Sequence, residues 1–212
     1  MLGGFGPPTF TMGDYSIEQR LFYLNLLLNE EEALNNYKNN EPFKFNRKVP
    51  FDISWDQIFL LLDEDIRNDV NTNQIYYNGK GFKIRKADRI NEISLFVDQL
   101  ELLFEKSKNT KKRPSDMHQI YITFTTDESI NSNIHDDNDA VFFWQVRGQS
   151  IWHIYKEEAL NKDLKDITED DISHTFHLDV GDLIYCPKYR RHSVITVKPR
   201  AGVSLGFQKL KQ

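Results

Sequence analysis

The segment spanning residues 135–155, HDDNDAVFFWQVRGQSIWHIY, indicates both the fold and the chemistry of this 212-residue chain. It begins with a His-x-Asp pair, His135 and Asp137, continues as an apolar strand, turns at Gly148 and leaves along a second strand. Side chains two residues apart on an extended strand project to the same face, so the pair can approach one ion. Asp136 should point away from that ion.

A second segment supplies a third candidate ligand. Residues 178–207 read LDVGDLIYCPKYRRHSVITVKPRAGVSLGF and place His192 at the start of another predicted hairpin. Two imidazoles and one carboxylate on rigid strands can hold one face of a divalent iron, leaving open positions for substrate and dioxygen. We therefore predict that His135, Asp137 and His192 are the metal ligands and the catalytic centre.

Helical patterns precede strand patterns along the chain. Apolar residues recur at helical spacing over 17–37, 54–62 and 93–104, whereas strands are predicted at 119–125, 141–147, 150–155, 183–186, 193–197 and 203–207. Ser54 and Gln57 form a predicted capping box for the second helix. This order predicts an α+β fold with a closed or sandwich-like barrel. We treat residues 1–212 as one domain, mainly helical over 1–115, with the barrel and metal site in 116–210.

Composition excludes several classes of protein. Hydrophobic residues make up 39% of the chain and aromatic residues 13%, which is typical of a globular domain. No apolar run is long enough for a membrane span, and the single cysteine, Cys186, fits a reducing, cytoplasmic setting. The densest basic cluster, residues 108–113, is expected to be a solvated loop, so neither nucleic acid nor a membrane is an expected partner.

The two segments also share a motif pattern with a known family. Gln145, Gly148 and Trp152 follow the His-x-Asp pair, and the last histidine follows Gly-Asp-x-x-Tyr-x-Pro, here residues 181–187. These motifs, within residues 118–208, resemble those of the cupin-like, JmjC-type 2-oxoglutarate oxygenases, particularly the protein hydroxylase and ribosomal-oxygenase branches. The resemblance implies a double-stranded β-helix, the cupin or jelly-roll barrel, with N-terminal helices packed on it.

The resemblance also implies a reaction. Its cofactors would be Fe(II), 2-oxoglutarate as cosubstrate and O2, with 2-oxoglutarate converted to succinate while a C–H bond of a protein or peptide side chain is hydroxylated. A small-molecule substrate stays open. One alternative is a non-catalytic cupin that binds a metal or a ligand. Another is a metal-dependent cupin isomerase or dioxygenase, although such enzymes usually present three or four histidines and only His135 and His192 qualify here.

One position departs from the family pattern. Family members usually carry a lysine two residues before the tryptophan, where it pairs with the distal carboxylate of 2-oxoglutarate, and this chain has Ser150. A buried carboxylate needs a compensating cation or several donors. We expect Ser150 with Tyr121 or Thr123 to serve first and Arg200 second, because residues 198–202 resemble a hairpin turn that would aim Arg200 outward. Gln145 either faces the pocket near the cosubstrate, as a further candidate for binding it, or bonds across the barrel.

The C-terminal end of the sequence bears on assembly. The chain ends at Gln212, almost directly after the last predicted strand, whereas relatives of this type commonly append a helical region for dimerisation. We therefore expect a monomer.

Overall fold

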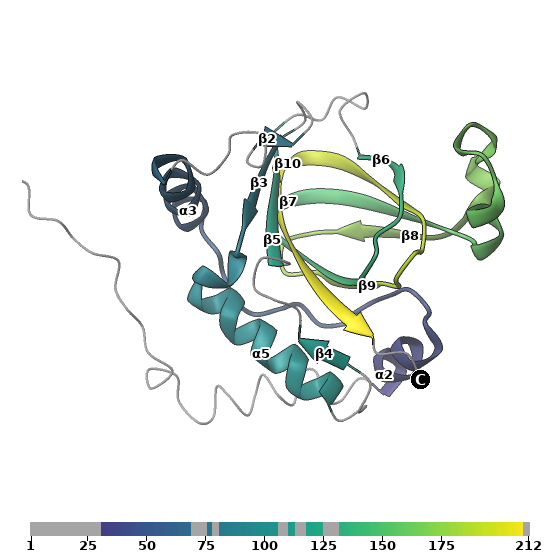
Figure 1. Cartoon of the computed structure of the whole chain (residues 1–212), viewed down its shortest axis with the longest axis horizontal. Coiled ribbons are helices and arrows are strands. Elements are labelled where there is room, and N and C mark those ends of the chain that lie inside the picture. The colour runs from purple at the N-terminus through teal and green to yellow at the C-terminus, as the bar shows by residue number, and fades with distance from the viewer. Residues whose placement is uncertain are drawn as a thin grey trace, which may run out of the picture.

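The computed structural model describes residues 31–68, 76–77, 81–105, 110–112, 118–124 and 132–209. Within these ranges, helices lie beside a β-barrel formed by the C-terminal part of the chain (Figure 1). Residues 1–30, which include the larger part of the helix predicted over 17–37, lie outside the described residues. No helix in the described ranges is long and apolar enough to cross a membrane.

The helices follow the local signals of the sequence. They are α2 (Glu31–Asn39), α3 (Trp55–Arg67) and α5 (Asn91–Glu105), with short 3-10 helices η2 (Ala87–Arg89), η5 (Glu157–Asn161), η6 (Leu164–Asp166) and η7 (Glu169–Asp171). The predicted capping box of α3 is confirmed, since the Gln57 backbone N–H donates to Ser54 Oγ at 3.1 Å and the Ser54 N–H donates to Gln57 Oε1 at 2.8 Å. Helix α2 continues to Asn39 and ends where Asn40 adopts a left-handed φ of 62°.

Two long strands pass through both layers of the barrel. The strands are β1 (Phe43–Lys44), β2 (Tyr76–Tyr77), β3 (Gly81–Arg85), β4 (Thr110–Lys112), β5 (His118–Thr123), β6 (Ser132–His135), β7 (Ala140–Tyr155), β8 (Ile172–Leu178), β9 (Leu183–Cys186) and β10 (His192–Lys209). The first half of β7 pairs with β9 and its second half with β8, while β10 pairs first with β6 and then with β5. Both strands also pair with each other along their length. This is the predicted double-stranded β-helix.

The strands bend where the sequence predicts hairpin turns. We expected reversals at Gly148 and at residues 198–202, but β7 and β10 continue through both places with shifts of register. Gly148 has a φ of 69°, and a Cβ on it would lie 2.0 Å from the carbonyl oxygen of Pro199. The two bends therefore face each other across the sheet, and glycine permits their close approach.

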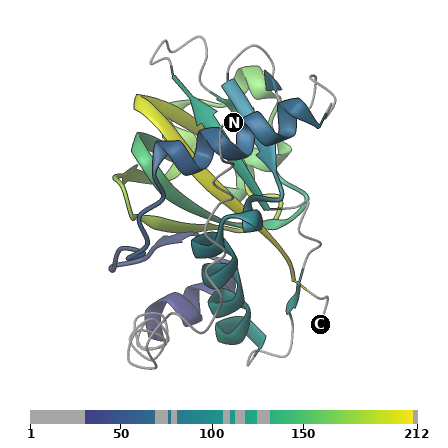
Figure 2. The same cartoon turned by 90° about the vertical axis from the view of Figure 1, so that its left-hand side faces the viewer.

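Two apolar cores lie on the opposite faces of β7 and β9. The outer core packs strand residues such as Ile120 and Trp144 against the helices, with Phe96 of α5 in edge contact with Trp144 at 5.2 Å between ring centroids. The inner core lies inside the barrel and includes Phe143 and Trp152. Figure 2 shows α3 and α5 on the outer side of the strands. The strand predicted at 119–125 is found as β5, where buried and half-buried residues alternate and Ile120 and Ile122 lie in the outer core.

The segment that follows α2 is attached along the edge of the barrel. The backbone N–H groups of Phe45 and Val49 donate to the carbonyls of Leu183 at 2.9 Å and Gly181 at 2.7 Å. Lys44 Nζ contacts the buried carboxylate of Asp182 at 2.7 Å. Asp182 Oδ2 also accepts from the Asp179 N–H at 2.8 Å, so this carboxylate stabilises the turn that leads into β9.

We expect Gly148→Ala to destabilise the protein. The added Cβ meets a backbone oxygen and the residue must keep a positive φ, a combination that costs about 1 to 3 kcal/mol. Urea denaturation of the two proteins measures the difference in the free energy of unfolding. Lys198→Ala, at an exposed position of the facing bend, is the matched control and should stay within about 0.5 kcal/mol of the wild type. Equal stability of Gly148→Ala and wild type would show that this close approach is unimportant.

Candidate metal centre and its pocket

A pocket of about 340 Å³ opens into the barrel between its two sheets. Its walls come from β3, β5, β7, β10, the end of β6 and the residues that follow β6. The polar lining consists of Gln119, Tyr121, Thr123, His135, Asp137, Asn138, Asp139, His192, Thr196, Arg200 and Ser204. A pocket of this size accommodates a small ligand together with one entering side chain.

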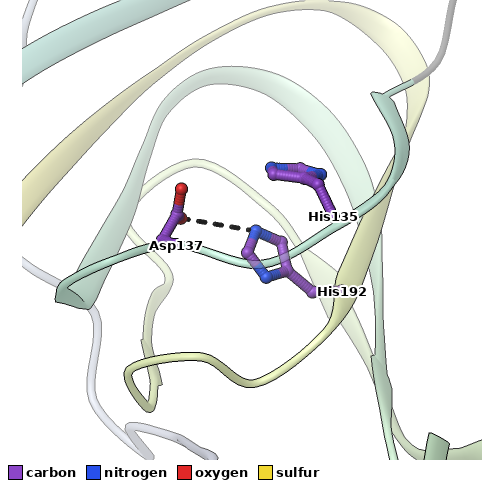
Figure 3. A group of neighbouring side chains, drawn as sticks. All are labelled: His135, Asp137 and His192. Carbon is purple, nitrogen blue, oxygen red and sulfur yellow. Dashed lines mark ion pairs between the residues drawn. The ribbon is translucent and has the colours of Figure 1, made fainter. Parts of the chain in front are cut away.

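The structure brings the three predicted ligands together at this pocket. Ligand atoms of His135, Asp137 and His192 all lie within 4.8 Å of one another, and Figure 3 shows the three side chains turned toward a common point. His192 Nε2 lies 3.6 Å from Asp137 Oδ2, and the two imidazole centroids are 4.3 Å apart. Among the described residues, this is the one such cluster of metal-ligating side chains.

Strand pairing explains the convergence of the two histidines. His135 is the last residue of β6 and lies directly opposite His192, the first residue of β10, in the antiparallel ladder. Side chains opposite each other in such a ladder lie about 5 Å apart at Cβ. Asp137 lies beyond the end of β6 and so is not on the strand as predicted. Its carbonyl accepts from the Tyr189 N–H at 2.9 Å, which ties this loop to the one before His192.

Backbone acceptors orient both imidazoles. His135 Nδ1 lies 2.7 Å from the carbonyl oxygen of Asn133, and His192 Nδ1 lies 3.0 Å from that of Arg190. Because a carbonyl can only accept, each Nδ1 must carry the proton, which leaves the lone pair on Nε2. This tautomer is the one that binds a metal through Nε2.

Burial and stacking favour a neutral His192. Its pKa is lowered from the ordinary value, first by desolvation and then by the charge of His135, with Asp137 acting in the opposite direction. The ring of Trp152 stacks on it with centroids 5.1 Å apart and planes inclined by 15°. A neutral, immobilised imidazole is a competent metal ligand.

Asp136, which we expected to point away from the ion, is exposed and is not a member of the cluster.

Arg200 points into the pocket, whereas we predicted that it would point outward. Because β10 does not turn at residues 198–202, Arg200 lies on the same face of the strand as His192 and Thr196 and lines the pocket. The residue is only 6% exposed, its Nε donates to Thr196 Oγ1 at 3.1 Å, and its Nη1 is buried without a hydrogen-bond partner in the described part of the chain. Desolvation lowers the pKa of Arg200 to about 10, so the group stays charged at neutral pH. A buried cation with an unused donor is costly unless an anion joins it.

Ser150 is not part of the pocket lining, contrary to prediction, and neither is Gln145, which instead bonds across the barrel. Ser150 Oγ donates to Gln145 Oε1 at 2.7 Å, and Gln145 Nε2 donates to the carbonyls of Arg147 and Ala201. The single O–H donor of Ser150 is therefore already used in a hydrogen bond to a neighbouring side chain. This pair supports the bends of β7 and β10 instead of facing a ligand.

Tyr121 and Thr123, the other predicted cosubstrate residues, line the pocket. Tyr121 Oη donates to Gln119 Oε1 at 2.6 Å, and Gln119 is a pocket residue that we did not predict. The alternation of β5 already places Gln119 on the face of Tyr121, so the sequence carried this signal. Thr196 and Asp139 were also missed, and only the closed barrel brings them to the pocket.

Comparisons with known proteins agree with this architecture. The JmjC domain family model matches residues 103–212, slightly more than half of the chain. The comparison with curated proteins gives no match. Among solved structures, YcfD, a ribosomal oxygenase from Escherichia coli in complex with cobalt and succinic acid, aligns with a TM-score of 0.57 at 17% identity, over 88% of this chain and 53% of that one.

Two further structures of the same protein give similar values. The complex of Escherichia coli YcfD with cobalt and 2-oxoglutarate has a TM-score of 0.57, 17% identity and the same coverage. An X-ray structure of Escherichia coli YcfD aligns at 15% identity with a TM-score of 0.57, over 88% of this chain and 55% of that one. At such identities the likeness establishes a shared fold, and the chain spans about half the length of these structures. Since the family model covers more than half of the sequence, the chain belongs to the JmjC domain family.

Proposed function

We propose that the protein is an Fe(II)- and 2-oxoglutarate-dependent oxygenase that hydroxylates a side chain of a protein or peptide. One observation carries the proposal: a single pocket combines the cluster of His135, Asp137 and His192 with the buried, incompletely paired guanidinium of Arg200. The donor set of two imidazoles and one carboxylate is the one used by non-haem Fe(II) oxygenases.

The cosubstrate assignment follows from the charges of the pocket. 2-Oxoglutarate has a 2-oxo acid end that chelates a metal and a distal carboxylate that needs a cation. Arg200 supplies that cation in place of the absent lysine, and its fork of N–H donors suits a carboxylate. Tyr121 and Thr123 place hydroxyl groups on the same lining. The structure of YcfD with cobalt and 2-oxoglutarate supports the assignment by fold likeness.

The residues of the chain have distinct roles in this reaction. Bound iron, with 2-oxoglutarate and O2, supplies the oxidising chemistry that hydroxylates a C–H bond and yields succinate and CO2. His135, Asp137 and His192 would hold the metal, and the carbonyls of Asn133 and Arg190 keep the imidazole rings in orientation. Arg200 binds and orients the cosubstrate, while Phe143 and Val194 limit the access of water.

A protein or peptide is the substrate that we favour. YcfD is described as a ribosomal oxygenase, and the likeness to it covers 88% of this chain. A small-molecule substrate and a non-catalytic cupin are the alternatives. The unused donor of Arg200 indicates an anionic ligand in either case, so catalysis itself has to be measured.

Succinate formation tests the proposed activity. With Fe(II), 2-oxoglutarate and air, the wild-type protein should form succinate slowly without substrate, because many oxygen-activating sites turn over their cosubstrate alone. His135→Ala should abolish this formation, since a metal ligand is lost. His153→Ala is the matched control, because His153 lies on β7 outside the pocket lining and should keep the wild-type rate. Tight metal binding without any succinate would favour the non-catalytic cupin.

Metal binding distinguishes Asp137 from its neighbour. Asp137→Ala should weaken the binding of Co(II) or Mn(II) by more than about 100-fold. Loss of a group that only orients a metal ligand typically weakens metal binding about 10- to 100-fold, and Asp137 is itself a proposed ligand. Asp136→Ala should bind nearly as the wild type does, because Asp136 is exposed and outside the cluster. Isothermal titration calorimetry measures both affinities. Equal losses in the two variants would contradict the assigned ligand set.

Cosubstrate affinity tests the role of Arg200. Arg200→Gln should raise the KM for 2-oxoglutarate about 30-fold or more, because removing one partner of a buried charge pair costs about 2 kcal/mol or more. Metal affinity should stay unchanged. Arg147→Gln is the control, since Arg147 pairs with Asp52 at 2.7 Å and does not line the pocket.

A double variant that transfers the positive charge from position 200 to position 150 makes this test sharper. Ser150 lies two residues before Trp152, the place of the usual family lysine, so the double variant Ser150→Lys with Arg200→Ser should recover part of the lost affinity. An unchanged KM in Arg200→Gln would show that another group binds the distal carboxylate.

A further inference from the structure

A partly exposed group of aromatic side chains lies next to the pocket. We call the residues Trp55, Phe59, Phe82 and Phe124 the aromatic ridge. Trp55 stacks on Phe59 with centroids 5.4 Å apart and on Phe124 at 5.9 Å. Phe82 meets Phe124 edge to face at 6.2 Å. The four rings therefore form one continuous surface drawn from α3, β3 and the end of β5.

Only part of the ridge anchors α3 to the barrel: Trp55 and Phe82 are half-buried and pack against the outer core, whereas Phe59 and Phe124 are exposed. That helix buries Ile58, Leu61 and Asp65, which lie on one face at helical spacing. Phe59 is 42% exposed and lies off this buried face, and Phe124 is 46% exposed. The same helix also exposes Leu60 at 66% and Ile66 at 55%. A contiguous group of exposed large apolar side chains is typical of a surface that binds another molecule.

The ridge is continuous with the pocket. Phe82 belongs both to the ridge and to the pocket lining. Phe124 directly follows Thr123, which also lines the pocket and pairs in the ladder with Arg200. A molecule that inserts one group into the pocket and continues outward along this side therefore meets the rings next.

We propose that the aromatic ridge is the docking surface for the polypeptide substrate, which places an aromatic or aliphatic side chain on it next to the residue that enters the pocket. This inference rests on the proposed function and specifies its substrate. Because Phe82 joins the pocket to the other rings, an extended chain can fill the pocket and contact the ridge at the same time, so the ridge favours a polypeptide over a small metabolite. Aromatic side chains supply much of the binding energy at such surfaces.

Peptide selection followed by binding measurements tests the ridge. The full chain, loaded with Mn(II) and the inert analogue N-oxalylglycine, is used to select from a phage-displayed library of short random peptides. Selected peptides should be enriched in aromatic or aliphatic residues. In fluorescence polarisation, Phe59→Gln and Phe124→Thr should each weaken their binding about tenfold or more. Leu164→Gln is the matched control, because Leu164 is 56% exposed on η6 and outside the pocket lining, and it should bind as the wild type does.

The outcomes separate this inference from the proposed activity. If the selected peptides bind both ridge variants as tightly as the wild type, the ridge is not the docking surface. The proposed activity would not be affected by that result, because succinate formation is measured separately. Loss of peptide binding in the ridge variants, with unchanged succinate formation in the absence of peptide, supports the ridge. A thermal stability that falls sharply in both variants would show that the rings stabilise the fold and would also overturn the inference. Absence of succinate from the wild type would overturn the activity alone.

Discussion

The antiparallel pairing of β6 with β10 is the contact on which the candidate site depends. It sets the last residue of one strand, His135, against the first residue of the other, His192, although 57 positions separate them in the sequence. Neither imidazole could be placed by a local element alone. The carbonyls of Asn133 and Arg190, each two residues before its histidine, then orient the rings, so the same two chain segments supply both the ligands and their supports. The geometry of the metal site thus follows from closure of the barrel.

The second constraint is the burial of a positive charge. Arg200 occupies the interior of a small barrel with one N–H group left without a partner in the described part of the chain, an arrangement that destabilises the protein unless an anion is bound. The neighbouring Ser150 and Gln145 satisfy each other and do not offset this cost. In the proposed enzyme, the cation that binds the cosubstrate is Arg200 on β10, whereas the usual family lysine would stand on β7 at the position of Ser150. Both strands face the same interior, so the change preserves the chemistry of the pocket.

Substrate selection would then use residues that lie outside the metal centre. The barrel provides the metal ligands and the cosubstrate cation, whereas α3 and β3 belong to the preceding part of the chain and contribute Phe59 and Phe82. Phe82 joins the two parts, because it lines the pocket and also contacts Phe124. Variation of the helical part could therefore change the bound polypeptide without altering the metal centre.

The sequence by itself indicated which three side chains meet at the candidate metal centre, the capped start of α3 and the apolar face of β5. The last two features depend on local spacing: Ser54 and Gln57 lie three apart, and Ile120 and Ile122 alternate with pocket residues. The three candidate ligands were indicated by the His-x-Asp and Gly-Asp-x-x-Tyr-x-Pro motifs. The tertiary structure decided where Arg200 and Ser150 point. Gly148 and residues 198–202 have the composition of turns, yet each is held in a continuous strand because the two bends pair with each other across the sheet. That pairing joins residues about fifty positions apart, so no local pattern of glycine and proline reveals it.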